Sequence, residues 1–370
     1  MKLFDEMLTR MHQEKYITFM DKLVAEKVPI ACFIPERTAE NMKFYRELFN
    51  QGFNLTELII PPVNVSKLSD SPKIFKCILV KDKLAASFLR IPELKDIPVI
   101  ILSKNTKKTR LIYDTYMKHL SDLAEVYSQL GDELSRKTFL GFLLAKVTRN
   151  LNYAVFADTS QYICEGFLPV AGSVVIDGGA CEGSTAAKFI DMGCKVYAFE
   201  MDRENFKLAE KVAREKNFIV ENLGLGSYNH KILYTHNVGH IGITRASEFG
   251  KETADIITLD EYVSNHKISK IDFIKLDTEG AELDILKGAK DVISYQKPVL
   301  AVSVYHKTEH IWEIAKYLKF IRPEHKFAVR HYLVSAEDVP FVFNESLKKY
   351  LSFIPDSKLV SFGECILFAK

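Results

Sequence analysis

Two acidic residues, Asp177 and Glu200, each follow a strand-like run in a segment whose composition is typical of a strand, a tight turn, a helix and a second strand. Residues 173–176 form a β-branched run, residues 177–183 contain three glycines, and residues 195–199 again favour a strand. A right-handed crossover places two such strands side by side, so their carboxyl ends open onto the same edge of a sheet. The pattern therefore predicts a ligand site between Asp177 and Glu200.

The glycine turn limits what this ligand is. Gly178 and Gly179 let a ligand approach the backbone closely, and an acidic residue about twenty positions later suits the hydroxyls of a ribose. The run DGGACEG lacks the G-x-G-x-x-G pattern of a pyrophosphate loop, and Asp177 would repel a pyrophosphate. A carboxylate instead helps to hold the ammonium and sulfonium of S-adenosylmethionine (SAM), so we expect SAM rather than a dinucleotide. The alternative is a turn that binds no ligand and whose glycines serve only the backbone geometry.

A second group of charged residues follows another apolar strand, at residues 271–276. Side chains alternate along a strand, which places Lys275 and Asp277 on the same side. A lysine in an apolar strand needs a partner, and the carboxylates at hand are Asp277, Glu279 and Glu282. We therefore expect charge to gather at this strand end, either for chemistry or as an internal ion pair that fixes the turn.

A third candidate is His306, which ends the apolar strand PVLAVSVYH and so belongs at the same edge of the sheet. We expect it to take part in acid or base chemistry. Because His306, Glu309 and His310 lie within one helical turn, they could also be read as a metal site. A zinc-protease helix has its Glu directly after the first His, whereas Glu309 comes three residues later. We therefore predict no metal site and place His310 on a helix surface.

The chain ahead of these stretches forms a domain of its own. Strand-like and helix-like segments alternate from residue 29 to 118, which predicts a smaller N-terminal α/β domain over residues 1–118. Its strand-to-helix turns lack the glycines that admit a phosphate, so docking or formation of a homo-oligomer is favoured over a second nucleotide site. Residues 121–150 favour helices, and the aromatic lead-in at 151–169 either covers the active site or packs on the sheet.

The composition is that of an ordinary globular protein. Of 370 residues, 47% are hydrophobic and 26% charged, and a net charge of +2 does not predict a nucleic-acid surface. Six cysteines are scattered without a C-x-x-C pair, which favours reduced thiols. No segment approaches the length of apolar sequence that spans a bilayer. We expect a cytoplasmic protein that binds no nucleic acid and has no integral membrane segment.

The chain over about residues 119–370 resembles the FkbM-type SAM-dependent methyltransferases. The resemblance rests on DGGA at 177–180 with Gly183 and Thr185, on AFEMDRENF around Glu200, on IKLDTEGAELDILKGA, and on VSVYH, FAVRHY and the closing ECILFAK. It implies a Rossmann-like seven-stranded sheet whose last strand, near residues 365–369, runs antiparallel. It also implies methyl transfer to an oxygen of a sugar, a glycan or a secondary metabolite. Cys181 departs from the broader D-x-G-x-G pattern at its second glycine.

These arguments together predict a set of site residues. The residues expected to contact SAM are Asp177, Gly178, Gly179, Ala180, Gly183, Thr185, Glu200, Asn222 and Asp277. Asp277 and His306 are the candidates for the base that takes the proton of an alcohol acceptor, and Lys275 is expected to orient Asp277 or the acceptor. Two other functions remain open at this point: an NAD-dependent oxidoreductase, and a SAM-fold binding or scaffold protein without catalysis.

Overall fold

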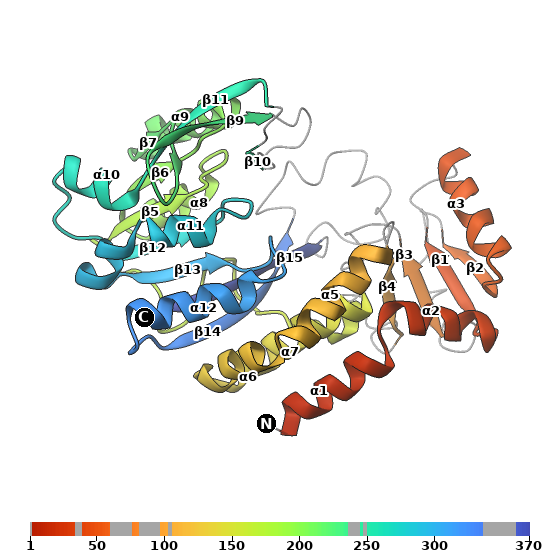
Figure 1. The fold of residues 1–370 in the computed structure, drawn as a ribbon. Helices are drawn as coiled ribbons and strands as arrows, with labels where there is room; N and C mark the ends of the chain where they lie inside the picture. The colour runs from red at the N-terminus through yellow and green to blue at the C-terminus, as the bar shows by residue number, and fades with distance from the viewer. Residues whose placement is uncertain are drawn as a thin grey trace. The chain divides into compact units, whose positions relative to one another are not determined.

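The computed structural model describes residues 2–33, 39–59, 76–80, 97–102, 106–235, 245–246, 250–335 and 360–370. The chain forms two compact units, coloured red to yellow and green to blue over most of their length in Figure 1. The first unit comprises Met1–Ser128, Glu133–Gln161 and His331–Glu364. The second comprises Gln129–Asp132, Tyr162–Arg330 and Cys365–Lys370.

The first unit contains a parallel four-stranded sheet. Its strands are β1 (Ile30–Phe33), β2 (Leu55–Ile59), β3 (Cys77–Val80) and β4 (Val99–Ile101), in the order β2-β1-β3-β4. Strands β1 and β3 are apolar and buried along their whole length, as expected for central strands that are covered on both faces. The predicted N-terminal α/β architecture is therefore present.

Helices complete the first unit. They are α1 (Lys2–Gln13), α2 (Tyr16–Ala25), α3 (Ala39–Asn50), α5 (Thr106–Lys118), α6 (Leu120–Gln129), α7 (Glu133–Thr148) and the 3-10 turn η4 (Leu151–Tyr153). Residues from α2, from α3 and from the sheet, such as Tyr16, Leu48 and Ile100, form one apolar core. The expected helical stretch at 121–150 corresponds to α6 and α7, and α7 packs against α1, α2 and α5.

The second unit contains most of a seven-stranded sheet with the order β14-β15-β13-β12-β5-β6-β7. The strands are β5 (Val174–Gly178), β6 (Lys195–Phe199), β7 (Ile219–Glu221), β12 (Phe273–Leu276), β13 (Val299–Ser303), β14 (Phe327–Ser335) and β15 (Val360–Ala369). The strands from β7 to β13 pair in parallel, and β15 runs antiparallel to β13. The blue strands β14 and β15 lie at one end of the sheet in Figure 1, and the green β6 and β7 at the other. The predicted seven-stranded sheet with an antiparallel last strand is confirmed.

The sheet changes direction between β5 and β12. From β5 the chain builds outward through β6 and β7, and then returns to add β12 and β13 on the other side. Ligands in open parallel sheets bind at such a switch point, beyond the carboxyl ends of the strands. The register sets Asp177 of β5 opposite Lys275 of β12, so the two chemical stretches of the sequence meet there.

Helices and a smaller sheet surround the seven strands. The helices are α8 (Ser184–Asp191), α9 (Arg203–Lys216), α10 (Leu259–Asn265), α11 (Glu282–Lys287), the π-helix η5 (Val292–Gln296) and α12 (His310–Ile321). The smaller sheet has the order β10-β9-β11-β8, from β8 (Gly224–Leu225), β9 (His230–Thr235), β10 (Arg245–Ala246) and β11 (Glu252–Ile257).

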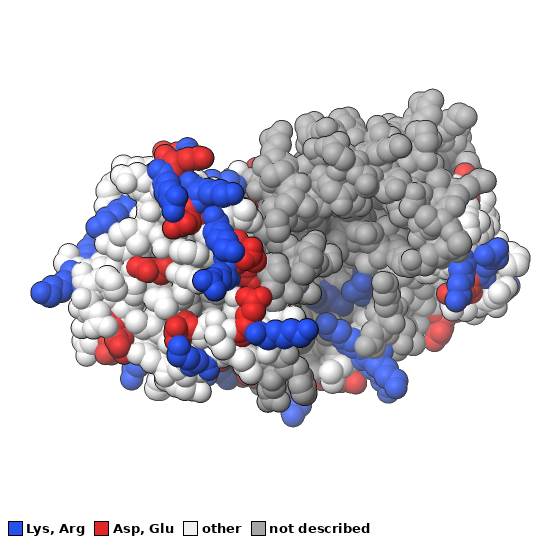
Figure 2. Space-filling model, turned by 90° about the horizontal axis from the view of Figure 1, so that it is seen from above, with Lys and Arg blue, Asp and Glu red and all other residues white. Residues whose placement is uncertain are grey.

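The described residues also show whether a helix could span a membrane and how charges are distributed on one face. None of their helices is both long enough and apolar enough to cross a bilayer. On the face drawn in Figure 2, Lys and Arg side chains are interspersed with Asp and Glu over the described residues.

Candidate active site

The glycine turn after β5 brings the backbone close to its neighbours. The Gly179 and Ala180 N–H groups both donate to the Phe199 carbonyl at 3.0 Å, which ties the turn to the end of β6. Gly179 has a φ of +78°, and a Cβ there would collide with the carbonyl of Asp277. Only glycine therefore allows β5 and β12 to approach each other here. Gly183, with a φ of +88°, begins α8, whose first turn contains Thr185.

Asp177 and Lys275 form a buried ion pair beneath this turn. Lys275 Nζ lies 2.8 Å from Asp177 Oδ1, and the two side chains are 3% and 0% exposed. The same ammonium donates to the Gly179 carbonyl at 2.8 Å. Burial raises the pKa of Asp177 above its ordinary value, and the Lys275 charge opposes that rise. The expectation that Lys275 pairs with a carboxylate of its own stretch was wrong, because its partner stands in register on the adjacent strand.

The second oxygen of Asp177 is a buried hydrogen-bond acceptor. Within the described residues Oδ2 has no hydrogen-bond partner, although the side chain is fully buried. An unsatisfied carboxylate oxygen of this type is costly unless a donor or a positive charge approaches it. A ligand ammonium at the edge of the turn would satisfy it.

Glu200 closes the other side of the turn. Its Oε2 accepts from the Cys181 N–H and its Oε1 from the Asp202 N–H, each at 2.8 Å. Burial raises the pKa of Glu200 to about 7, and these N–H groups hold it from rising further. A carboxylate has about four acceptor sites, so Glu200 keeps capacity for the hydroxyls of a ligand. The side-chain amide of Asn222 donates to the Glu200 carbonyl at 2.9 Å, which places Asn222 beside it.

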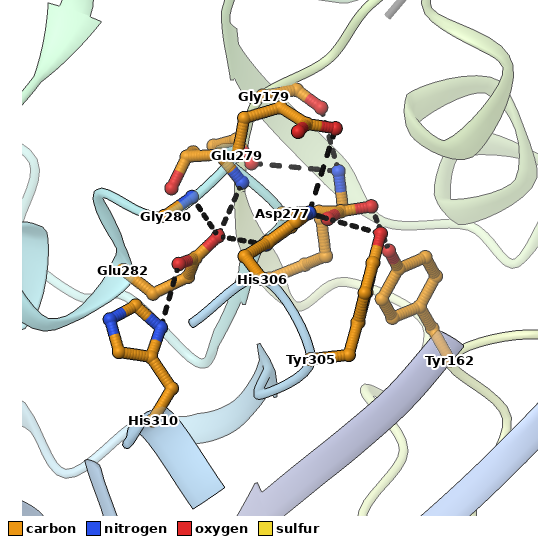
Figure 3. A network of polar contacts seen from close by, with 12 residues as sticks. Tyr162, Gly179, Asp277, Glu279, Gly280, Glu282, Tyr305, His306 and His310 are labelled. Atoms are coloured by element: carbon orange, nitrogen blue, oxygen red, sulfur yellow. Dashed lines mark hydrogen bonds and ion pairs between the residues drawn. The ribbon is translucent and has the colours of Figure 1, made fainter. Parts of the chain in front are cut away.

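Asp277, at the end of β12, lies in a different environment. The Tyr162 hydroxyl donates to its Oδ2 at 2.9 Å, and the Tyr305 hydroxyl to its Oδ1 at 3.3 Å. Figure 3 shows both rings directed toward this carboxylate. Tyr162 belongs to the aromatic lead-in and is only 3% exposed, so at this position the lead-in reaches the site.

His306 lies between Glu282 on one side and the two acids Asp277 and Glu279 on the other (Figure 3). Its Nδ1 is 2.8 Å from Glu282 Oε1, and its Nε2 is 3.5 Å from Asp277 Oδ1 and 3.6 Å from Glu279 Oε1. On the far side of Glu282, His310 Nδ1 is 3.1 Å from Oε2. The surface position predicted for His310 was wrong: the residue is 1% exposed, because its ring turns inward to the buried carboxylate.

Glu282 connects this cluster to the backbone. Its Oε1 accepts from the Thr278 N–H at 2.8 Å and from the Gly280 N–H at 3.3 Å. Burial would raise the pKa of Glu282, but hydrogen bonds from His306 and His310 hold it below its ordinary value. Burial would lower the pKa of His306, but the surrounding carboxylates of Glu279, Glu282 and Asp277 raise it to about 10. These carboxylates therefore favour the positively charged form of the His306 imidazole.

Three residues of the site were not among the site residues predicted from the sequence: Tyr162, Tyr305 and His310. Glu279 and Glu282 were expected at this strand end only as partners of Lys275, whereas they contact His306. Tyr305 precedes His306, so its place at a strand end was a usable signal, whereas Tyr162 is more than a hundred residues from Asp277 along the chain. Cys181, Glu279 and Tyr162 also have positive φ angles of 51°, 55° and 63°. Such backbone conformations concentrate at functional sites and cannot be read from residue type.

Comparison with known proteins identifies the domain that carries this site. Residues 177–332 match the family model described as the methyltransferase FkbM domain. The chain contains a methyltransferase FkbM domain. The matched residues begin at Asp177 and include the glycine turn, Glu200 and the whole cluster around His306. Tyr162 lies ahead of it. No curated protein matches the sequence.

Solved structures share the fold. The FkbM methyltransferase from Methylobacillus flagellatus KT superposes with a TM-score of 0.61 at 17% identity, and the match covers 98% of each chain. Fibrillarin from Aeropyrum pernix with bound SAM gives a TM-score of 0.31 at 11% identity, covering 56% of this chain and 70% of that one. Precorrin-6y C5,15-methyltransferase from Geobacter metallireducens GS-15 gives a TM-score of 0.31 at 10% identity, and the match covers 58% of this chain and 93% of that one. The first match shows a common fold, and the other two support no argument about this chain.

Proposed function

We propose that this methyltransferase uses SAM and transfers the methyl group to a hydroxyl oxygen of a small molecule or glycan, such as a sugar or a secondary metabolite. The observation that supports SAM is the pair of buried carboxylates on either side of the glycine turn. Asp177 presents an acceptor oxygen that lacks a partner among the described residues, and Glu200 lies at the end of the adjacent strand. SAM contains an amino acid joined to a ribose, so one carboxylate can hold its ammonium and the other its ribose hydroxyls.

The residues of the turn fit this cofactor. Asp177 would hold the ammonium group, Glu200 the ribose hydroxyls and Asn222 the adenine edge. Gly178 and Gly179 leave the backbone of the turn without side chains, so the cofactor can lie against it. When bound, SAM supplies an electrophilic methyl group attached to a sulfonium.

The β12 end supplies the chemistry for a hydroxyl acceptor. Asp277 already accepts hydrogen bonds from two phenol groups, those of Tyr162 and Tyr305. An acceptor hydroxyl can make the same kind of bond and release its proton to the carboxylate as its oxygen becomes nucleophilic. His306 lies beside Asp277 and would hold it in place. We propose that Lys275 fixes the turn rather than the acceptor, because its ammonium is bonded to Asp177 and the Gly179 carbonyl.

The cofactor is tested first. Calorimetric titration should show binding of SAM and of S-adenosylhomocysteine, and both should raise the melting temperature, whereas NAD should do neither. Stabilisation by NAD without binding of SAM would instead favour the oxidoreductase.

The acceptor is tested with SAM that carries a ¹³C-labelled methyl group. The full chain is incubated with a panel of sugars, glycans and hydroxylated metabolites, and the products are analysed by NMR and mass spectrometry. An O-methyl product supports the proposal, and a label on nitrogen or carbon contradicts it. A trapped acceptor without methyl transfer would favour the scaffold function. The homo-oligomer through the N-terminal domain and the cytoplasmic location stay predictions.

A further inference from the structure

The cluster around His306 lies at the carboxyl ends of β12 and β13. Its residues come from the turn at residues 277–281, from the start of α11 and from the turn that precedes α12. Asp277, Glu282 and His306 each place one possible ligand atom within 4.8 Å of the other two. Glu279 adds a third carboxylate to the same imidazole.

One side of the imidazole is fixed. Glu282 is fully buried, and a carboxylate can only accept, so the hydrogen of the 2.8 Å contact belongs to His306 Nδ1. The Thr278 and Gly280 N–H groups hold the same carboxylate from the backbone. A carboxylate behind one ring nitrogen is the arrangement that orients a histidine toward a metal ion with its other nitrogen.

The other ring nitrogen faces a gap between two acids. His306 Nε2 is buried, in a side chain that is 3% exposed, and has no hydrogen-bond partner among the described residues. Its distances of 3.5 Å to Asp277 Oδ1 and 3.6 Å to Glu279 Oε1 are too long for good hydrogen bonds. Bonds of about 2.0–2.2 Å to one cation would place adjacent ligand atoms about 3–3.5 Å apart. The distances from Nε2 to each of the two carboxylate oxygens are therefore close to the spacing of neighbouring ligands on one ion.

The acids outnumber the imidazole in this part of the cluster. Three carboxylates surround one imidazole, and the ammonium of Lys275 pairs with Asp177. Asp277 and Glu279 are 20% and 21% exposed, so an ion can reach them from solvent.

We propose that His306 Nε2, Asp277 and Glu279 bind a divalent cation, with Glu282 orienting the imidazole from behind. One nitrogen and carboxylate oxygens, without sulfur, suit Mn²⁺ or Mg²⁺. Water would complete the coordination on the exposed side, where an acceptor hydroxyl could replace it and become more acidic. This proposal differs from the prediction of no metal site that was made from the sequence, and the experiment below distinguishes the two. The site does not depend on the identity of the acceptor.

Mn²⁺ alone is the probe. After treatment with EDTA and buffer exchange, the full chain is titrated with Mn²⁺, and the free ion is followed by electron paramagnetic resonance. We expect one Mn²⁺ per chain. Asp277→Asn and Glu279→Gln should each weaken binding by about tenfold or more, and Glu282→Gln by about 10- to 100-fold. Glu313→Gln, an exposed acid in the first turn of α12, is the matched control and should bind like the wild type.

Circular dichroism and titration with S-adenosylhomocysteine show separately that each variant is folded. Absence of Mn²⁺ binding by the wild type, with a proton held on Nε2 in ¹⁵N NMR spectra, would overturn the proposal. So would Mn²⁺ binding that survives in Asp277→Asn and Glu279→Gln. If Mn²⁺ binds but S-adenosylhomocysteine does not, the cofactor proposal fails and the cation site stands.

Discussion

The edge of the seven-stranded sheet has two halves that differ in how their buried charges are paired. In the half proposed to bind the cofactor, at β5 and β6, the ammonium of Lys275 lies 2.8 Å from the buried Asp177. In the half proposed to bind the acceptor, at β12 and β13, the three carboxylates of Asp277, Glu279 and Glu282 surround His306. β12 serves both halves, because Lys275 within the strand and Asp277 just beyond it have different neighbours. A single strand thus joins the buried Asp177–Lys275 pair to a cluster in which three carboxylates surround one imidazole.

The largest effect is expected from breaking the pair in the cofactor half. Lys275→Met leaves Asp177 buried without its counter-charge and should lower the free energy of unfolding by about 3–5 kcal/mol. Lys270→Met is the control, because Lys270 is 67% exposed and its pair with Asp272 should contribute about 0–1 kcal/mol. Chemical denaturation followed by circular dichroism measures both. Equal losses would mean that the buried pair does not stabilise the turn.

In the acceptor half, substitution should affect turnover rather than cofactor affinity. Asp277→Asn keeps the shape but removes the charge, and should lower methyl transfer by about 10²-fold or more with SAM affinity nearly unchanged. Asp284→Asn, an exposed acid on α11, should have little effect. Parallel loss of SAM binding and activity would move Asp277 into the cofactor half.

Within the cofactor half, Glu200 is expected to hold the ligand. Glu200→Ala should weaken SAM binding by about 1–3 kcal/mol, since ribose hydroxyls lose a charged acceptor. Glu204→Ala, at a half-exposed position in the first turn of α9, provides the control. Calorimetric titration that gives the same affinity for Glu200→Ala and wild type would remove Glu200 from the site.

The smallest effect is the pH dependence of that affinity. Burial raises the pKa of Glu200 from 4.5 to about 7, so the ligand-free protein carries a proton there below neutrality. If the ribose requires the carboxylate, SAM affinity should fall about tenfold from pH 8 to pH 6. The raised pKa also means that the contribution of Glu200 to folding stability decreases as pH rises from 4.5 to 7. Glu200→Gln should abolish the pH dependence of SAM binding. If the pH dependence persists in this variant, another titrating group causes it.

Much of this architecture could be predicted because it is encoded locally. The β-branched run before Asp177, the glycines after it and the strand that ends at Glu200 specify a βαβ unit without knowledge of the rest of the chain. The placement of Asp177, Asp277 and His306 at one edge also follows from strand direction in a parallel sheet. These residues do lie at that edge.

The contacts between them depend on tertiary structure. Residue type shows that Lys275 needs a partner, but only the register between β5 and β12 selects Asp177 over the acids that follow Lys275 in sequence. Likewise, His310 has the sequence context of a surface helix, and it is buried because the carboxylate of Glu282 lies beneath it. Sequence thus determined which charged groups reach the ligand edge, since strand ends are local features. Tertiary structure decided which charges neutralise each other, because Coulomb energy depends on distance in space and on burial rather than on separation along the chain.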